Sequence, residues 1–181
     1  DARRTGPQYV TVMVDAYRDA GLEVVYLPGV CSTSYFYYAA MRHPELAAII
    51  AGASHNPSGD TGQKILGPGV LPIAQGIGPG GGLDRIKELY LEGRSVGGAK
   101  RGRIRTRDLM TDFVNHSLNL AGVEPGSLEG AGVFQDYLFG AAGREMMLAF
   151  ERAGASLEPL HFTADGSFPL GDPNPVKQAV I

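Results

Sequence analysis

Residues 46–57 read Leu-Ala-Ala-Ile-Ile-Ala-Gly-Ala-Ser-His-Asn-Pro, with Gly62 and Lys64 a few positions further on. The apolar run at 46–50 predicts a buried strand, and the polar residues after it predict a loop at the end of that strand. Proteins of the α/β class place their chemistry in the crevice outside the carboxyl ends of parallel strands. This stretch therefore predicts an α/β fold with a candidate site at Ser54.

The residue types in this loop suit group transfer. A serine hydroxyl is a weak nucleophile near neutral pH and needs a base, a metal ion or prior phosphorylation. His55 and Lys64 could give or take protons, and Lys64 could instead hold an anion as a point charge. Pro57 disfavours helical geometry at Asn56, so we expect a stiff, extended loop. A turn that only caps a strand has the same composition and is the simpler alternative.

A family resemblance favours the functional interpretation. The string Gly52-Ala53-Ser54-His55-Asn56-Pro57, with Gly62-Gln63-Lys64-Ile65 and Gly67-Pro68-Gly69 after it, resembles the phosphoserine loop of the α-D-phosphohexomutases. This family is the phosphoglucomutase/phosphomannomutase superfamily. Asp1-Ala2-Arg3-Arg4-Thr5-Gly6 resembles the end of its Gly-x-Asp-x-Arg segment, and residues 21–29 resemble the helix-strand stretch that comes next in the family.

The resemblance continues towards the end of the chain. Residues 136–143, 165–169 and 173–175 are similar to segments of the family's second domain. Two local departures leave the substrate subgroup open: Cys31-Ser32-Thr33-Ser34 stands where the family usually has Thr-Pro, and Thr61-Gly62 where it usually has Asn-Gly. The family's Asp-Gly-Asp-x-Asp-Arg metal loop, Glu-x-Ser-Gly sugar loop and Arg-x-Ser-Gly-Thr phosphate site do not occur in this sequence.

The resemblance implies an α/β fold of mixed, largely parallel sheets flanked by helices. Residues 1–103 would form phosphohexomutase domain 1 without its first strand, including the catalytic serine loop at 52–67. Residues 104–181 would begin domain 2. We therefore expect the chain to be an excerpt of a longer enzyme, and expect the missing C-terminal domains of the same polypeptide to be its partners.

The implied activity is interconversion of hexose 1-phosphate and hexose 6-phosphate through a phosphoserine and a bisphosphate intermediate. The implied cofactor is Mg²⁺ in the full-length parent, with hexose 1,6-bisphosphate as activator, and the isolated chain is expected to be inactive. A catalytically silent sugar-phosphate-binding or scaffold module is the alternative. A serine hydrolase fits less well, because the Ser-x-Gly elbow is absent.

The resemblance also assigns roles to single residues. Ser54 carries the phosphate and contacts the metal through it, and His55 and Lys64 transfer or orient protons. Arg3 or its neighbour Arg4 holds an anion, and Asn56 ties the loop backbone.

Composition fits this interpretation. The net charge of −3 offers no field to attract nucleic acid, and no apolar run reaches the roughly 18 residues of a membrane span. Neither nucleic acid nor a membrane is thus expected as a partner, and the expected location is the cytoplasm. The ligand that the resemblance implies is hexose phosphate. The single cysteine, Cys31, lies in an apolar segment and is expected to be a buried, inert thiol. His43, His116 and His161 lack partners at metal-ligand spacing and are expected at the surface or in packing.

Periodicity predicts alternating elements. Helices are expected at 8–20, 33–42, 83–92, 108–120 and 140–153, and strands at 23–27, 47–51, 132–135 and 156–161. The first two strands with the helix between them predict a right-handed βαβ unit. We expect residues 67–82 to be irregular and mobile, residues 93–103 to be a linker, and the tyrosines at 35, 37 and 38 to fill the core and the space between domains.

Two further patterns carry weaker signals. Residues 76–81 match Gly-x-Gly-x-x-Gly before a helix, but Pro79 interrupts the pattern and no acidic residue follows at the required distance, so a flexible loop is favoured over dinucleotide binding. Residues 100–107 are rich in arginine and could contact phosphate or nucleic acid. Alternation of Arg with Ile and Thr equally suits an edge strand with a charged face.

Overall fold

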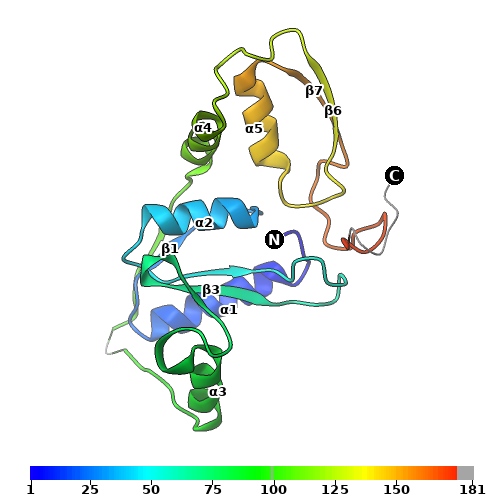
Figure 1. Ribbon diagram of the computed structural model, residues 1–181. Helices are drawn as coiled ribbons and strands as arrows, with labels where there is room; N and C mark the ends of the chain where they lie inside the picture. Colours follow the sequence, from blue (N-terminus) through cyan, green and yellow to red (C-terminus); the bar gives the residue numbers. More distant parts are fainter. Residues whose placement is uncertain (99, 175–181) are drawn as a thin grey trace.

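The computed structural model describes residues 1–98 and 100–174. It has the α/β architecture expected from the sequence (Figure 1). The elements from the N-terminus to residue 106 are α1 (Gly6–Asp19), β1 (Val24–Tyr26), α2 (Thr33–Arg42), β2 (Ala48–Ala51), β3 (Gln63–Gly67), β4 (Leu71–Ile73), α3 (Leu83–Leu91) and β5 (Ile104–Thr106). The elements after these are α4 (Met110–Ala121), β6 (Gly132–Asp136), α5 (Gly143–Ala153) and β7 (Ser156–Leu160).

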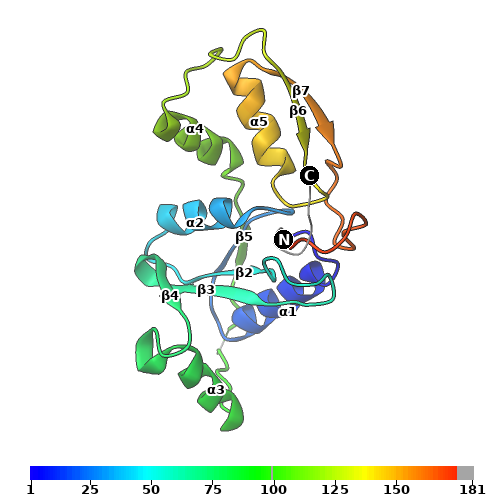
Figure 2. The same cartoon turned by 45° about the vertical axis from the view of Figure 1, so that its right-hand side comes forward.

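The strands form both parallel and antiparallel pairs. β1 pairs with β5 and β6 pairs with β7, in both cases in parallel, whereas β2, β3 and β4 form an antiparallel sheet in that order. Helices α1 and α2 lie on opposite sides of the antiparallel sheet, as the two views in Figures 1 and 2 show. The fold class is therefore mixed α/β, as predicted.

The predicted βαβ unit between strands 23–27 and 47–51 is wrong in its pairing. β1 and β2 belong to different hydrogen-bonded sheets, because β2 pairs with β3 and β1 pairs with β5. The chain turns back after the serine loop, so β2 finds its partner at the next strand along the sequence rather than at the strand before it. Among the described residues, the strand that precedes Ser54 therefore has an antiparallel neighbour.

Residues 67–82 are also more regular than predicted. They contain β4, which pairs with β3 through Ile65 and Ile73, and two short 3₁₀ turns at Pro68–Val70 and Pro79–Gly81. The second turn is formed by the last three residues of the glycine-rich motif at 76–81. Gly82 at its end has φ +64°, and a Cβ there would lie 1.9 Å from the carbonyl oxygen of Ile77. Glycine at this position therefore serves the tight turn itself.

Helix α2 lies at the centre of the molecule. One side packs on the antiparallel sheet through Phe36, Ala40 and the sheet residue Leu66. Another side packs against the following half of the chain through Tyr35, which clusters with Met110 and Val114 of α4. A helix that is covered on two sides must be apolar on both, which accounts for its unusual density of aromatic residues.

The tyrosines of α2 were expected to fill the core and the space between domains, and two of the three do so. Tyr35 and Tyr38 are buried, and both rings contact Phe113 with centroid distances of 5.6 and 5.5 Å. Tyr37 is 38% exposed, so it does not fill the core. His116 packs on the Tyr38 ring at 5.3 Å, in agreement with a packing role for this histidine.

The boundary between the two halves was predicted at residue 103. Because β5 pairs with β1, we propose a boundary near residue 107 and use the names first unit for residues 1–106 and second unit for residues 107–174. Residues 93–98 and 100–103 contain no helix or strand, which agrees with a linker there. Pro175, in one of the family-like segments, lies outside the described residues. Within the described chain, no helix has both the length and the apolar character to cross a membrane.

Candidate functional site

The serine loop connects β2 to β3 and spans residues 52–62. Its base is closed by a hydrogen bond from the Gly52 amide to the Gly62 carbonyl, 2.9 Å long. Two successive turns form the rest, with the Asn56 amide donating to Ala53 and the Asp60 amide to Pro57, both at 3.0 Å. The loop predicted at 52–67 is therefore shorter than expected, because its last five residues are strand β3.

Ser54 lies in the first turn and is exposed. Its φ is +53°, in the left-handed region that residues other than glycine seldom adopt. Holding a non-glycine residue there costs about 1 to 3 kcal/mol and requires support from the surrounding structure. The Ser54 hydroxyl lies 3.3 Å from Nδ1 of His55, so these two adjacent side chains face each other.

Arg3 supplies much of that support. Its side chain is 1% exposed and reaches the inner side of the loop. Nη1 donates to the Pro57 carbonyl at 2.5 Å, and Nη2 donates to the carbonyls of Asn56 at 2.7 Å and Ser54 at 3.3 Å. Nε lies 3.3 Å from the carboxylate of Asp1. One buried guanidinium thus gathers three loop carbonyls that point to the same side.

The anion-holding role expected of Arg3 stays a prediction. In this structure its buried guanidinium contacts three loop carbonyls and a carboxylate, so Arg3 organises the loop. Arg4, the predicted alternative, has a side chain that is 74% exposed and lies 3.6 Å from Asp165. Of the two arginines, only Arg4 presents its charge to solvent.

Asp1 and Thr5 also hold the loop, and sequence reasoning missed both. The backbone nitrogen of Asp1 donates to the Ala51 carbonyl at 2.9 Å, and its carboxylate accepts from the Ala53 amide at 3.3 Å. The hydroxyl of Thr5 pairs with that of Thr61 at 2.5 Å, at the far end of the loop. Residues 1–5 therefore contact the beginning, the middle and the end of the serine loop.

The remaining predicted residues lie on or next to the loop. Asn56 ties the loop through its backbone amide and carbonyl, while the residue itself is exposed. Lys64 is in β3 rather than in the loop, pairs with Ile50 of β2, and is exposed. The structure therefore brings Ser54, His55 and Asn56 into one turn and places Lys64 on the strand that leaves it.

Cys31 has the environment expected of an inert thiol. It is half-buried, and burial raises the pKa of the thiol above its ordinary value, so little thiolate forms near neutral pH. The adjacent Ser32 contacts Glu145 of α5, a buried carboxyl that is 8% exposed. Burial raises the pKa of Glu145. This contact between the two units was not foreseen, because Glu145 resembles any glutamate in the first turn of a helix.

Two of the histidines that were expected at the surface or in packing have carboxylate partners nearby. His43 lies 3.6 Å from Glu45, and His161 lies 2.9 Å from Asp136. Over the described residues, no three His, Cys, Asp or Glu side chains are grouped so that they could hold a metal ion. Ser54 alone does not make a divalent-cation site, so the Mg²⁺ that the resemblance implies for the full-length parent would need ligands beyond these described residues.

Two arginines of the arginine-rich segment at residues 100–107 form ion pairs within the first unit. Arg101 pairs with Asp15 and Asp19 of α1, and Arg105 pairs with Glu23 at 2.6 Å. β5 is an exposed edge strand, as the alternative interpretation of this segment predicted. Two of the segment's five cationic side chains, those of Arg101 and Arg105, are therefore matched by carboxylates of the same chain.

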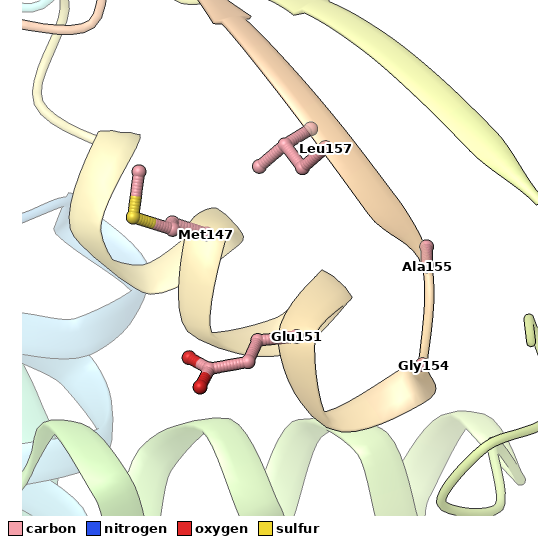
Figure 3. Close-up of a pocket in the computed structure, with 5 residues that line it drawn as sticks. All are labelled: Met147, Glu151, Gly154, Ala155 and Leu157. Atoms are coloured by element: carbon pink, nitrogen blue, oxygen red, sulfur yellow. The ribbon is translucent and has the colours of Figure 1, made fainter.

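A hollow of about 390 Å³ lies in the second unit, beside the end of α5 and the start of β7. In Figure 3, Leu157 points from β7 towards α5, whereas Met147 and Glu151, one turn apart on α5, extend to the same side of that helix. The other lining residues are Gly154 and Ala155. None of these residues belongs to the serine loop, and an apolar lining with one carboxylate does not suit a phosphate. The hollow is therefore not the candidate site.

Comparison with known proteins agrees with the geometry. The family model described as phosphoglucomutase/phosphomannomutase, alpha/beta/alpha domain I matches residues 1–76, which include the whole serine loop. The phosphomannomutase of Vibrio cholerae is 27% identical over 97% of this chain and 38% of its own length. The phosphoglucosamine mutase of Rhodococcus jostii is 30% identical over 92% of this chain and 36% of its own length.

Solved structures show the same fold. A putative phosphomannomutase from Thermus thermophilus aligns with a TM-score of 0.73 at 20% identity, over 97% of this chain and 39% of that protein. A phosphoglucomutase/phosphomannomutase family protein from Burkholderia thailandensis gives 0.71 at 24% identity, over 97% of this chain and 37% of that protein. The chain thus spans less than two fifths of the length of the relatives it matches. Residues 1–76 thus match domain I of the phosphoglucomutase/phosphomannomutase family, and the chain is similar to members of that superfamily along nearly all of its length.

Proposed function

We propose that this chain is the part of a phosphohexomutase that carries the phosphoryl group, and that Ser54 is the carrier. The observation that supports this most directly is the exposed Ser54 hydroxyl in a strained turn whose carbonyls are drawn inward by Arg3. Strained backbone that the surroundings hold in place is typical of functional sites. A turn that only connects two strands needs neither a left-handed serine nor a buried arginine beneath it.

The proposed chemistry is reversible phosphoryl transfer. The bond between phosphorus and the Ser54 oxygen breaks, and a new bond forms between phosphorus and a hydroxyl oxygen of the hexose phosphate. The proton of that hydroxyl leaves to a base, and the serine oxygen takes up a proton. The resulting bisphosphate then returns its other phosphoryl group to Ser54, so the phosphate changes position on the sugar and the enzyme is restored.

His55 is the best-placed group for the proton at the serine oxygen, since its Nδ1 lies 3.3 Å from that oxygen. General acids and bases act within hydrogen-bond reach of the atom they serve, and such contacts commonly shorten when substrate binds. Lys64 is assigned to the substrate hydroxyl or its phosphate, because it is an exposed cation on the strand that leaves the loop. No step is assigned to Mg²⁺, for which the described residues offer no three-ligand cluster.

The substrate class is hexose phosphate. The relatives named above comprise phosphomannomutases and a phosphoglucosamine mutase, so the comparison supports the phosphosugar reaction rather than one particular sugar. A phosphorylated serine carries close to two negative charges at neutral pH, and a positive neighbour favours that state. The cationic side chains of Lys64 and Arg4 could provide it.

The test is transfer of phosphate to Ser54 in the full-length protein that contains this chain. The protein is incubated with glucose 1,6-bisphosphate or mannose 1,6-bisphosphate, and its intact mass and fragment masses are measured. We expect one added phosphate on Ser54, its loss in Ser54→Ala, and its retention in Ser58→Ala, a serine of the same loop. Mutase turnover should fall by several orders of magnitude in Ser54→Ala only. Binding of hexose phosphate without any phosphate transfer would instead identify a catalytically silent module.

A further inference from the structure

The turn at residues 165–168 of the second unit packs on the backbone beneath the serine loop. Gly166 is buried there, and a Cβ at this position would lie 2.5 Å from the Ala2 carbonyl oxygen, from the Arg3 Cα and from the Arg4 amide nitrogen. Real Cβ contacts essentially never become this short, and the three atoms are backbone, which cannot rotate aside. Only glycine allows the turn to approach residues 2–4 so closely.

The turn is held in shape by its own hydrogen bonds. The Asp165 carboxylate accepts from the amide of Ser167 at 2.9 Å and from its hydroxyl at 2.8 Å. The Phe168 amide donates to the Asp165 carbonyl, and the Asp165 amide donates to Phe139, both at 3.0 Å. The turn is thus an ordered part of the second unit. Its contacts with residues 2–4 join that unit to the first.

Phe168 extends this contact to the guanidinium of Arg3. The Arg3 Cζ lies 5.5 Å from the centre of the Phe168 ring, within the range of a cation–π interaction. The same guanidinium donates to the carbonyls of Ser54, Asn56 and Pro57. A single buried side chain therefore connects a turn of the second unit with the backbone of Ser54.

We propose that residues 165–168 are a positioning element for Ser54: Gly166 sets the distance between the units, and Phe168 fixes the guanidinium that holds the loop. Neither residue needs to touch the substrate. The proposal rests on the proposed function for its kinetic consequences, but its structural consequence, a serine loop stabilised by the second unit, is independent of any reaction.

The expected effect arises from the precision that group transfer requires. A displacement of about 1 Å in a reacting group can lower a rate by about 10²-fold, even when the substituted residue is far from the chemistry. Removing the Phe168 ring leaves Arg3 its hydrogen bonds but takes away one wall of its site. The serine loop should then sample more conformations, while the residues expected to contact the hexose phosphate are unchanged.

The experiment compares variants of the full-length protein that contains this chain. Phe168→Leu removes the ring but keeps an apolar side chain, Phe168→Tyr restores the ring, and Gly166→Ala introduces the colliding Cβ. Phe162→Leu is the matched control, because Phe162 packs its ring on Tyr137 within the second unit rather than over the guanidinium. Gly132→Ala is the control for Gly166→Ala, because a Cβ at Gly132 meets nothing within 4 Å.

Two readouts are measured. Hydrogen–deuterium exchange of peptides covering residues 52–62 reports on the loop without any reaction, and single-turnover phosphorylation of Ser54 by glucose 1,6-bisphosphate reports on the rate. We expect about 10-fold faster loop exchange and 10- to 100-fold slower phosphorylation in Phe168→Leu, with KM unchanged. Phe168→Tyr should behave like the parent, as should both controls.

The outcomes separate the two proposals. If the parent takes up no phosphate on Ser54, the proposed function fails, while loop exchange still tests the positioning element. If loop exchange in Phe168→Leu matches that of the parent, the positioning element is refuted, even when Ser54 is phosphorylated normally. If Phe162→Leu accelerates hydrogen–deuterium exchange of the serine loop as much as Phe168→Leu does, the positioning element is also refuted. The effect would then come from a general loosening of the second unit. Should Gly166→Ala fail to fold, the Phe168 variants still decide the matter.

Discussion

The hydroxyl of Ser32 donates a 2.8 Å hydrogen bond to the carboxyl group of Glu145. The same hydroxyl oxygen accepts from the Tyr35 amide at 3.1 Å, so Ser32 is the N-terminal cap of α2 and at the same time its link to α5. Glu145 is only 8% exposed. A titratable group thus lies at the junction of the two units.

The first prediction concerns the dependence of stability on pH. Burial raises the pKa of Glu145 above its ordinary value of 4.5, against the opposing effect of the Ser32 hydrogen bonds. Between 4.5 and the raised value the folded state binds more protons than the unfolded state, so the free energy of unfolding falls as pH rises through this window. Glu145→Gln should remove that fall.

The measurement is the melting temperature between about pH 4 and pH 8 for the parent, Glu145→Gln and Glu151→Gln. Glu151 is an exposed glutamate on the same helix and serves as the matched control. The parent and Glu151→Gln should lose stability in parallel above pH 4.5, and Glu145→Gln should lose less. Superimposable curves for all three proteins would show that Glu145 does not titrate in the way its burial requires.

The second prediction concerns the strained turn. Ser54→Gly relieves the left-handed backbone and should raise the free energy of unfolding by about 1 kcal/mol relative to Ser58→Gly. Both substitutions add the same flexibility to the unfolded chain, so their difference isolates the strain. Ser58 is absent from the described residues with positive φ. Urea unfolding measures the difference, and a more stable Ser58→Gly would contradict the strain.

The third prediction separates the roles of His55 and Lys64. If either transfers a proton, its replacement by His55→Gln or Lys64→Met should lower mutase turnover of the full-length protein by about 10²- to 10⁴-fold. Lys64→Arg keeps the charge but loses the removable proton. Normal turnover in Lys64→Arg would leave Lys64 an electrostatic role only. Lys87→Arg, an exposed change on α3, is the control.

The fourth prediction concerns the contact between α2 and the start of α4. The Tyr35 hydroxyl oxygen accepts a 2.8 Å hydrogen bond from the Leu109 amide. Tyr35→Phe leaves that part-buried amide without its partner and should cost about 1 to 3 kcal/mol in the free energy of unfolding. Tyr37→Phe, on the same helix but 38% exposed, should be nearly neutral. Equal stability of the two variants in urea would contradict the argument.

Periodicity predicted the helices because their apolar positions recur locally. The helix expected at 33–42 has these bounds in the structure, with Ser32 as its cap. β3 was missed because Gln63 and Lys64 follow a glycine and precede a Gly-Pro pair, which is typical of loops. Its strand character comes from pairing with β2, a tertiary interaction that no local pattern contains.

The sequence named the residues of the candidate site, whose roles stay predictions, but it did not indicate how the loop is held. The types and order of Ser54, His55 and Asn56 indicated the loop. The family resemblance assigned an anion-holding role to Arg3 or Arg4, but it did not indicate that Arg3 would be buried under the loop and hydrogen-bonded to loop carbonyls. Glu145 gave no signal, because its significance arises only when the second unit packs on the first.

The parallel pairing of β1 with β5 has a consequence for synthesis on the ribosome. Tyr26 and Ile104 are separated by 78 residues, so at ordinary translation rates β1 waits about 4 to 16 s for its partner to be made. During that interval its backbone amides and carbonyls on that side are unpaired and open to other strands. The carboxylate of Glu23, next to β1, lies where a charge would deter such wrong pairing until Arg105 arrives to neutralise it.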